Sequence, residues 1–266
     1  MRLTGTLLKM KSELGDQVIY NLPIGKELLP MNELIGKNIS LKYENEIYCI
    51  ACGSKTRKSF SQGLCYSCFV SSPEASECIL RPELCRAHEG KGRDIEFEKK
   101  NHLQEHFVYL ALSSDLKVGV TRSTQVPTRW IDQGASFAIC LAKVPYRHLA
   151  GVIEVELKKH LVDKTNWQRM LKNEIKAGVD LIAEKNKIRD LLPEEYKQYC
   201  FSDDVITTIN YPVISYPSKV KSIDLEKTSS LKGLKLIGIK GQYLIMEDNS
   251  VLNIRKHSGY LVTVEV

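Results

Sequence analysis

The stretch FVYLALSSDLKVGV, residues 107–120, decides the fold of the central part of this sequence. An apolar run at 107–112 is followed by a polar break at Ser113-Ser114-Asp115 and by a second apolar run at 117–120. Short apolar runs separated by small polar residues are typical of a β-hairpin. We therefore predict two paired strands at the start of a central domain.

Signals for further helices and strands follow this hairpin. Pro127 and Gly134 frame a short helix, because proline is favoured near a helix start and glycine just past its end. Leu149, Ile153 and Leu157 recur every four positions, which predicts a helix with one buried face. The expected elements are a helix at 127–133, a strand at 137–142, a helix at 146–161 and a long helical stretch at 167–192. The central order is thus β-β-α-β-α-α.

The segments on either side of this region have other patterns. Residues 1–48 and 201–266 alternate short apolar runs with turn residues, which indicates strands, and the second of these segments suits a small barrel or sheet. Residues 49–106 contain six of the eight cysteines and little periodicity, so a metal is expected to order them. We predict an α+β protein with a β-rich N-terminal segment (1–48), a cysteine-rich zinc-binding module (49–106), a central domain (107–200) and a C-terminal β segment (201–266) that can pack with 1–48.

The composition is that of a folded protein without a membrane segment. Of 266 residues, 43% are hydrophobic and 26% charged, which is ordinary for a globular chain. No apolar run is long enough to span a bilayer and the N-terminus lacks the apolar core of a signal peptide, so we expect a cytoplasmic location and no membrane partner. Residues 107–200 carry fifteen Lys or Arg against eleven Asp or Glu, which favours DNA or RNA as a partner, although solvated helix faces account for the same charges.

Four cysteines form a pattern that predicts a metal site. Cys49-Ile50-Ala51-Cys52 and Cys65-Tyr66-Ser67-Cys68 are two C-x-x-C pairs separated by twelve residues. Each pair can direct two thiolates at one ion, and four thiolates make a closed tetrahedral zinc site. A redox dithiol and buried cysteines without a metal are the alternatives. A closed site leaves no position for water, so this zinc is predicted to be structural.

A second group of metal-ligating residues follows with less regular spacing. Cys78, Cys85, His102 and His106 can supply a second zinc site, because thiolate and imidazole ligands combine freely on zinc. His88 is a further candidate ligand. Free thiols and surface histidines are the alternative interpretation. The remaining two cysteines, Cys140 and Cys200, lie in apolar elements and are expected in the core.

Phe107-Val108-Tyr109 and Lys117-Val118-Gly119 resemble the paired hairpin motifs of the GIY-YIG nuclease superfamily. The order of elements resembles that superfamily too, in which a later helix carries an arginine and another carries a metal-binding glutamate. The resemblance places Arg129 and Glu154 in these two roles, with Glu156 a less favoured choice. It implies a GIY-YIG-like domain that cleaves DNA or RNA with Mg²⁺ or Mn²⁺ at Glu154. Phe107 and Lys117 depart from the glycine and tyrosine that are usual in the motifs.

Over a longer span the sequence resembles the domain-of-unknown-function 2797 family, a prokaryotic group defined by sequence. The phrases that carry this resemblance are CIACGSKTRKSFSQGLCYSCF, ILRPELC, VYLALSSDLKVGVTRSTQVPTRWIDQGA, DKTNWQRML and GIKGQYLI. They cover nearly the full length. By this resemblance Gly92 stands where a cysteine is expected, which weakens a second zinc site or shifts its ligands towards His102 and His106.

The nuclease resemblance gives each candidate residue a role. Arg129 would grip nonbridging phosphate oxygens through its planar guanidinium, with Arg122 in reserve. Tyr109 would accept the proton of a water, and Lys117 would lower the pKa of Tyr109 if their side chains share a face. A noncatalytic nucleic-acid binder is the alternative function. A further alternative is a zinc-stabilised protein-interaction module with a partner surface at Trp130, Trp167 and the β barrel.

Overall fold

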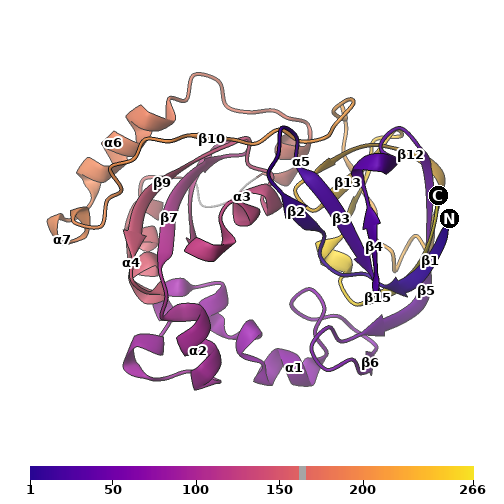
Figure 1. Ribbon diagram of the computed structural model, residues 1–266, viewed down its shortest axis with the longest axis horizontal. Helices are drawn as coiled ribbons and strands as arrows, with labels where there is room; N and C mark the ends of the chain where they lie inside the picture. The colour runs from indigo at the N-terminus through magenta and orange to yellow at the C-terminus, as the bar shows by residue number, and fades with distance from the viewer. Residues whose placement is uncertain (162–165) are drawn as a thin grey trace. The chain divides into compact units, whose positions relative to one another are not determined.

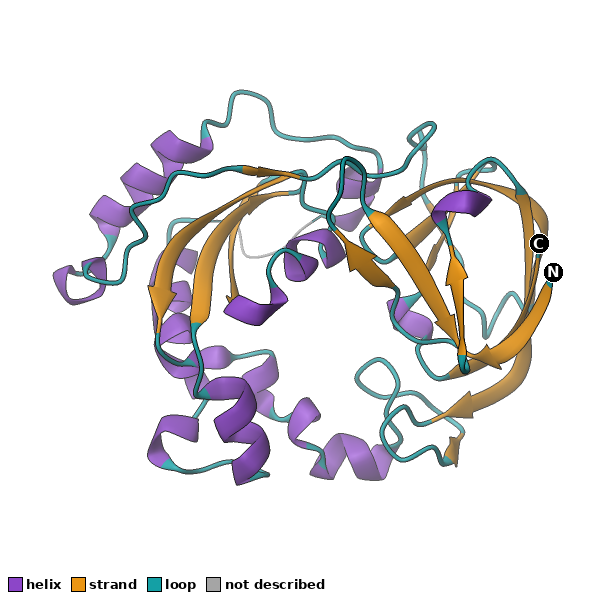
Figure 2. Ribbon diagram, in the orientation of Figure 1, coloured by secondary structure: helices purple, strands orange, loops and turns teal. Residues whose placement is uncertain are grey.

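The computed structural model describes residues 1–161 and 166–266 and divides into two compact units. Unit 1 comprises Met1–Val70 with Asn210–Val266, and unit 2 comprises Ser71–Ile209. Unit 1 consists largely of strands, whereas helices flank the sheet of unit 2 (Figure 2). The predicted α+β class is confirmed. None of the helices in the described ranges combines the length and apolar character needed to cross a membrane. Residues 163–165, the start of the DKTNWQRML phrase, lie outside the described residues.

Unit 1 contains an eight-stranded and a three-stranded sheet (Figure 1). The larger sheet has the order β1-β15-β5-β12-β13-β14-β11, with β6 also paired to β5, and the smaller has the order β2-β3-β4. The strands are β1 (Arg2–Thr6), β2 (Lys11–Glu13), β3 (Ile19–Ile24), β4 (Glu27–Pro30), β5 (Asn38–Tyr48), β6 (Lys55–Thr56), β11 (Lys221–Ser222), β12 (Ser230–Lys240), β13 (Tyr243–Met246), β14 (Ser250–Asn253) and β15 (Tyr260–Glu265).

The long strand β5 joins the two chain segments of unit 1. It is hydrogen-bonded between β12 and β15, so a strand from the N-terminal part lies between two from the C-terminal part. Its buried residues alternate along the strand at Ile39, Leu41 and Tyr43, as expected when one face of a sheet packs on a core. The short helices of this unit are η1 (Asn32–Leu34), η7 (Arg255–His257) and α1 (Tyr66–Ser71), which ends at the first residue of unit 2.

Unit 2 is built on a four-stranded antiparallel sheet of order β10-β9-β7-β8. Its strands are β7 (His106–Leu112), β8 (Leu116–Arg122), β9 (Phe137–Val144) and β10 (Thr207–Thr208). The predicted hairpin is confirmed, because β7 and β8 pair from His106↔Arg122 to Leu112↔Leu116. The register places Tyr109 opposite Gly119 and Ala111 opposite Lys117, which puts these four residues on one face of the sheet.

Helices cover the two faces of this sheet (Figure 1). On one face, Val108 and Leu110 share a core with Ile153 of α4 (Arg147–Lys158) and with α6 (Leu181–Leu191). On the other face, the ring of Tyr109 lies 5.9 Å from Trp130 of α3 (Thr128–Asp132). Both α3 and α4 fall within the helices predicted from the sequence.

The predicted long helix at 167–192 is wrong. The chain instead forms α5 (Trp167–Leu171), a nonhelical stretch, and then α6. Asn173 and Gly178 have positive φ values of 57° and 73°, which a right-handed helix does not accommodate. Asp180 begins α6 afresh, because its carboxylate accepts hydrogen bonds from the backbone N–H groups of Ile182 and Ala183. After Pro193 the chain makes one more turn, α7 (Glu194–Lys197).

The residues before and after the hairpin form short helical turns. They are η2 (Pro73–Ala75), η3 (Glu77–Ile79), η4 (Pro82–Leu84), η5 (Ala87–Glu89), the longer α2 (Ile95–His102) and, after the hairpin, η6 (Ser123–Gln125). The first four turns bury few apolar side chains, since the core cluster in this region consists of Cys78, Cys85 and Ala87. Their order therefore depends on other interactions.

Candidate functional site

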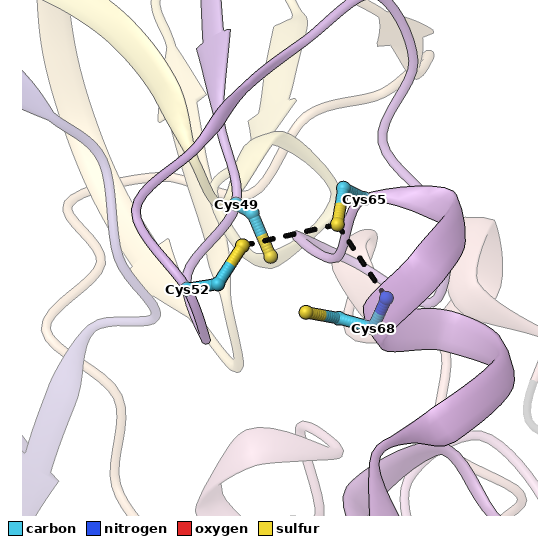
Figure 3. Close-up of side chains that lie close together, drawn as sticks. All are labelled: Cys49, Cys52, Cys65 and Cys68. Carbon is cyan, nitrogen blue, oxygen red and sulfur yellow. Dashed lines mark hydrogen bonds between the residues drawn. The ribbon is translucent and has the colours of Figure 1, made fainter.

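Cys49, Cys52, Cys65 and Cys68 converge within unit 1 (Figure 3). Cys49 follows the last residue of β5, and Cys65 immediately precedes α1, in which Cys68 lies. Backbone hydrogen bonds hold the two loops in place, one from Gly53 N to the Cys49 carbonyl at 2.8 Å and one from Ile50 N to the Gly63 carbonyl at 2.9 Å. All four sulfurs lie within 4.8 Å of one another.

The spacing of these sulfurs suits a tetrahedral zinc ion. Zn–S bonds of about 2.3 Å place tetrahedral sulfurs about 3.8 Å apart, and Cys52 Sγ lies 3.9 Å from Cys65 Sγ. The surrounding thiols raise the pKa of Cys68 to about 12 through hydrogen bonds, whereas Ser54 helps to lower that of Cys52 to about 6. Four thiolates at this separation would need a cation to balance their charge. The cluster can therefore hold zinc in a closed site.

The second predicted set of metal ligands comes together in unit 2 with one change. Cys78, Cys85 and His102 place ligand atoms within 4.8 Å of one another, and Glu98 completes this group. His106 is not a member, and its Nδ1 lies 2.8 Å from the Gln104 carbonyl oxygen. Sequence reasoning missed Glu98, although its spacing of four residues from His102 on one helix was a usable signal.

A buried polar cluster surrounds Tyr109 on the α3 side of the sheet. Tyr109 is 0% exposed, and its hydroxyl donates a hydrogen bond to Gln133 Oε1 at 3.1 Å. Arg129 of α3 and Glu154 of α4 both lie close enough to influence the pKa of this hydroxyl. Two of the predicted site residues, from two helices, are therefore within electrostatic range of a third, which lies on a strand. No sequence pattern pointed to Gln133 as a member of this cluster.

Burial sets the protonation of Tyr109. Desolvation raises the pKa of Tyr109, and the nearby Arg129 guanidinium opposes that rise only in part. This direction is opposite to the lowered pKa expected from the sequence. Tyr109 is therefore a neutral phenol near pH 7 and acts as a hydrogen-bond donor.

The other charged candidates are also largely buried. Lys117 is 7% exposed and lies on the same sheet face as Tyr109, diagonal to it across the hairpin. Glu154 is 8% exposed, and Lys158 Nζ lies 3.5 Å from its carboxylate, one helical turn away. Arg129 is half-buried and therefore reaches solvent. Arg122, the reserve phosphate ligand, instead donates to the side chain of Asn101.

One of the two tryptophans predicted for a partner surface is buried. Trp130 is 3% exposed and packs edge-on against Tyr109, so it contributes to the interior of unit 2. Trp167 is half-buried. A surface that uses both rings is therefore not present in this unit.

Gly119 leaves the space that the Tyr109 ring occupies. A Cβ atom at Gly119 would lie 2.5 Å from the Tyr109 hydroxyl oxygen and 2.6 Å from Cζ, closer than such atoms approach. Gly119→Ala is expected to displace the ring and to lower the free energy of unfolding by about 1–3 kcal/mol, measured in urea. In the double variant with Tyr109→Leu the two losses should be less than additive. Additive losses would show that the ring does not fill this space.

The fold and these residues define an α+β protein with a four-cysteine metal site beside β strands. Residues 36–262 match the family described as "Protein of unknown function (DUF2797)". The chain belongs to this family. No curated protein and no solved structure matched the sequence or the fold.

Proposed function

We propose that this protein is a metal-dependent nuclease that hydrolyses phosphodiester bonds of DNA or RNA, with a structural zinc ion at Cys49, Cys52, Cys65 and Cys68. The observation that carries the proposal is that Arg129 and the buried Glu154 both lie within electrostatic range of the buried Tyr109 hydroxyl. The resemblance to GIY-YIG nucleases predicted these residues as one site, although they come from a strand and two helices. Residues of separate elements are not close in space unless the fold brings them together.

The donor atoms present fit a hard divalent cation. Glu154 offers a carboxylate, and Mg²⁺ commonly binds one or two protein carboxylates while it keeps several waters. Glu154 would therefore hold Mg²⁺ or Mn²⁺. When bound, such a cation would neutralise negative charge on the phosphate oxygens.

The protein's own side chains supply the remaining requirements. Arg129 reaches solvent and carries a planar guanidinium that suits two phosphate oxygens. Tyr109 is neutral and fully buried and donates its one hydroxyl hydrogen to Gln133 Oε1, so its role would be to position Arg129. Lys117 adds positive charge on the same sheet face. Hydrolysis adds water across one P–O ester bond and yields a phosphate monoester and a hydroxyl group.

The test is a cleavage screen with the purified full chain. Labelled single- and double-stranded DNA and RNA are incubated with Mg²⁺ or Mn²⁺, and the products are separated on denaturing gels. We expect cleavage of at least one substrate with either ion and none in EDTA. Intact substrates under all conditions, with a zinc-loaded and folded protein, would contradict the proposal.

A second candidate function is a noncatalytic nucleic-acid binder. The complete burial of Tyr109 and the position of Lys158 beside Glu154 favour it, because both features reduce access to the groups that chemistry needs. It predicts binding that weakens linearly on a plot of log affinity against log salt, without cleavage. The cleavage screen separates the two functions, and the salt series shows whether the protein contacts phosphates at all.

A further inference from the structure

A group of four ligand-type side chains lies in unit 2, apart from the polar cluster around Tyr109. Cys78 lies in η3, Cys85 directly follows η4, and Glu98 and His102 lie on α2. Their exposed fractions are 8%, 1%, 3% and 2%. All four ligand atoms lie within 4.8 Å of one another. Charged and thiol groups are rarely buried together in this way unless they pair or bind a metal.

One distance within this group suits a tetrahedral ion. Cys85 Sγ lies 3.6 Å from His102 Nδ1, and tetrahedral Zn–S and Zn–N bonds of about 2.3 and 2.0 Å separate these two atoms by about 3.5 Å. The Glu98 carboxylate contacts the same ring nitrogen. Both neighbours therefore converge on Nδ1, which is the nitrogen that would bind the metal.

The absence of a side chain at Gly92 leaves space for the Glu98 side chain. A Cβ atom at Gly92 would lie 2.3 Å from Glu98 Cγ and 2.7 Å from Oε1, so a larger residue at Gly92 would occupy the place of the carboxylate arm. Asp94 caps α2 by accepting a hydrogen bond from Phe97 N at 2.9 Å. The edge of the His102 ring packs against Phe97, which limits its rotation.

This region has little apolar core of its own. Four short 3-10 turns, η2 to η5, follow one another, and the local core cluster holds only Cys78, Cys85 and Ala87 among the described residues. Short turns without an apolar core are commonly ordered by a metal or by disulfides. Cys78 and Cys85 are both free thiols.

We propose that Cys78, Cys85, Glu98 and His102 bind a second zinc ion, with Nδ1 as the histidine ligand. Two thiolates, an imidazole and a carboxylate are all zinc ligands, and the thiolates disfavour Mg²⁺ and Ca²⁺. With four protein ligands the site is closed, so its zinc is structural.

The site also fixes the helix that carries Glu154. The Arg147 guanidinium on α4 donates to the Cys78 carbonyl oxygen at 2.8 and 3.0 Å and to the Ile79 carbonyl oxygen at 2.9 Å. Gly151 allows α4 to approach the backbone of Pro82 and Glu83 closely, since a Cβ there would lie 2.1 Å from Glu83 N. The metal assignment does not depend on the proposed nuclease function. Only the suggestion that this site helps to position Glu154 on α4 rests on the nuclease proposal.

Zinc content per chain tests the assignment directly. Elemental analysis of the dialysed full chain is expected to give two zinc ions, and His102→Ala is expected to give one. Glu96→Gln on the same helix, whose side chain is exposed, is the control and should keep two. One zinc in the wild type, or two in His102→Ala, would overturn the proposal. Cleavage is not part of this measurement, so its outcome does not depend on nuclease activity.

X-ray absorption at the zinc edge keeps the test valid if His102→Ala does not fold. The wild type with both sites filled has four sulfur ligands at one zinc and two at the other. We therefore expect an average of three sulfurs and one nitrogen or oxygen per zinc. A first shell of sulfur alone would contradict the second site.

Discussion

Cys65→Ser is expected to release zinc from the four-cysteine site and to disorder residues 49–70. This segment has one short helix and a two-residue strand, so besides the metal its two loops are joined by only a few hydrogen bonds and ring contacts. Structural zinc contributes an apparent free energy of about 10–16 kcal/mol in zinc-finger peptides at neutral pH, far more than such a segment can replace. Hydrogen exchange of the backbone amides at 49–70 measures the loss of order, and a colorimetric chelator measures the released zinc.

The sheet of unit 1 should survive this substitution. β5, β12 and β15 pair over long registers and bury their own core, so their amides should remain protected. Cys200→Ser is the matched control, because this thiol belongs to neither ligand cluster of the described residues. Unchanged protection at 49–70 in Cys65→Ser would show that zinc does not order the segment.

Arg129→Ala is expected to reduce the rate of phosphodiester cleavage by about 100-fold to 1,000-fold, the usual effect of removing one group that stabilises transition-state charge. Arg129 is the half-exposed cation of the Tyr109 cluster, so it is the group best placed to reach a phosphate. The measurement is the cleavage rate at saturating protein with one labelled substrate.

Arg169→Ala is the control for this loss of charge. Arg169 lies in the same unit and pairs with Asp115 at 2.8 Å, so it tests the general effect of removing an arginine. Its variant should cleave at nearly the wild-type rate. Equal losses in both variants would indicate a dependence on total charge and would remove Arg129 from the proposed site.

Local patterns predicted much of unit 2. The hairpin of β7 and β8 follows from two apolar runs around Ser113-Ser114-Asp115, and α4 follows from Leu149, Ile153 and Leu157. The break between α5 and α6 was missed because residues 172–180 contain ordinary helix formers. It depends on the positive φ values of Asn173 and Gly178 and on the Asp180 cap, which periodicity does not reveal.

The two metal-type clusters differ in how far sequence could predict them. Only two residues separate Cys49 from Cys52 and Cys65 from Cys68, so the members of each pair must lie close together. Spacing alone therefore predicted that cluster. The cluster in unit 2 depends on how the turns η3 and η4 fold against α2. That tertiary arrangement selects Glu98, whereas His106 belongs to strand β7 and contacts Gln104.

For the residues near Tyr109, the sequence predicted the identities of the side chains but not their electrostatics. The resemblance named Tyr109, Arg129 and Glu154, and the last two lie within electrostatic range of the Tyr109 hydroxyl. Their electrostatics were not predictable, because the pKa of Tyr109 depends on complete burial beneath α3. A sequence shows which group is a phenol but not how much solvent reaches it.

The most direct test of the proposed nuclease site compares Glu154→Gln with Glu156→Gln in single-turnover cleavage. Both glutamates lie on α4, but Glu154 belongs to the Tyr109 cluster and Glu156 pairs with Lys159 at its surface. Binding should change little in either variant. We predict that Glu154→Gln loses cleavage by at least about 100-fold, as expected for loss of a metal ligand at a reacting phosphate, and that Glu156→Gln retains it. Equal cleavage by the two variants would contradict the account.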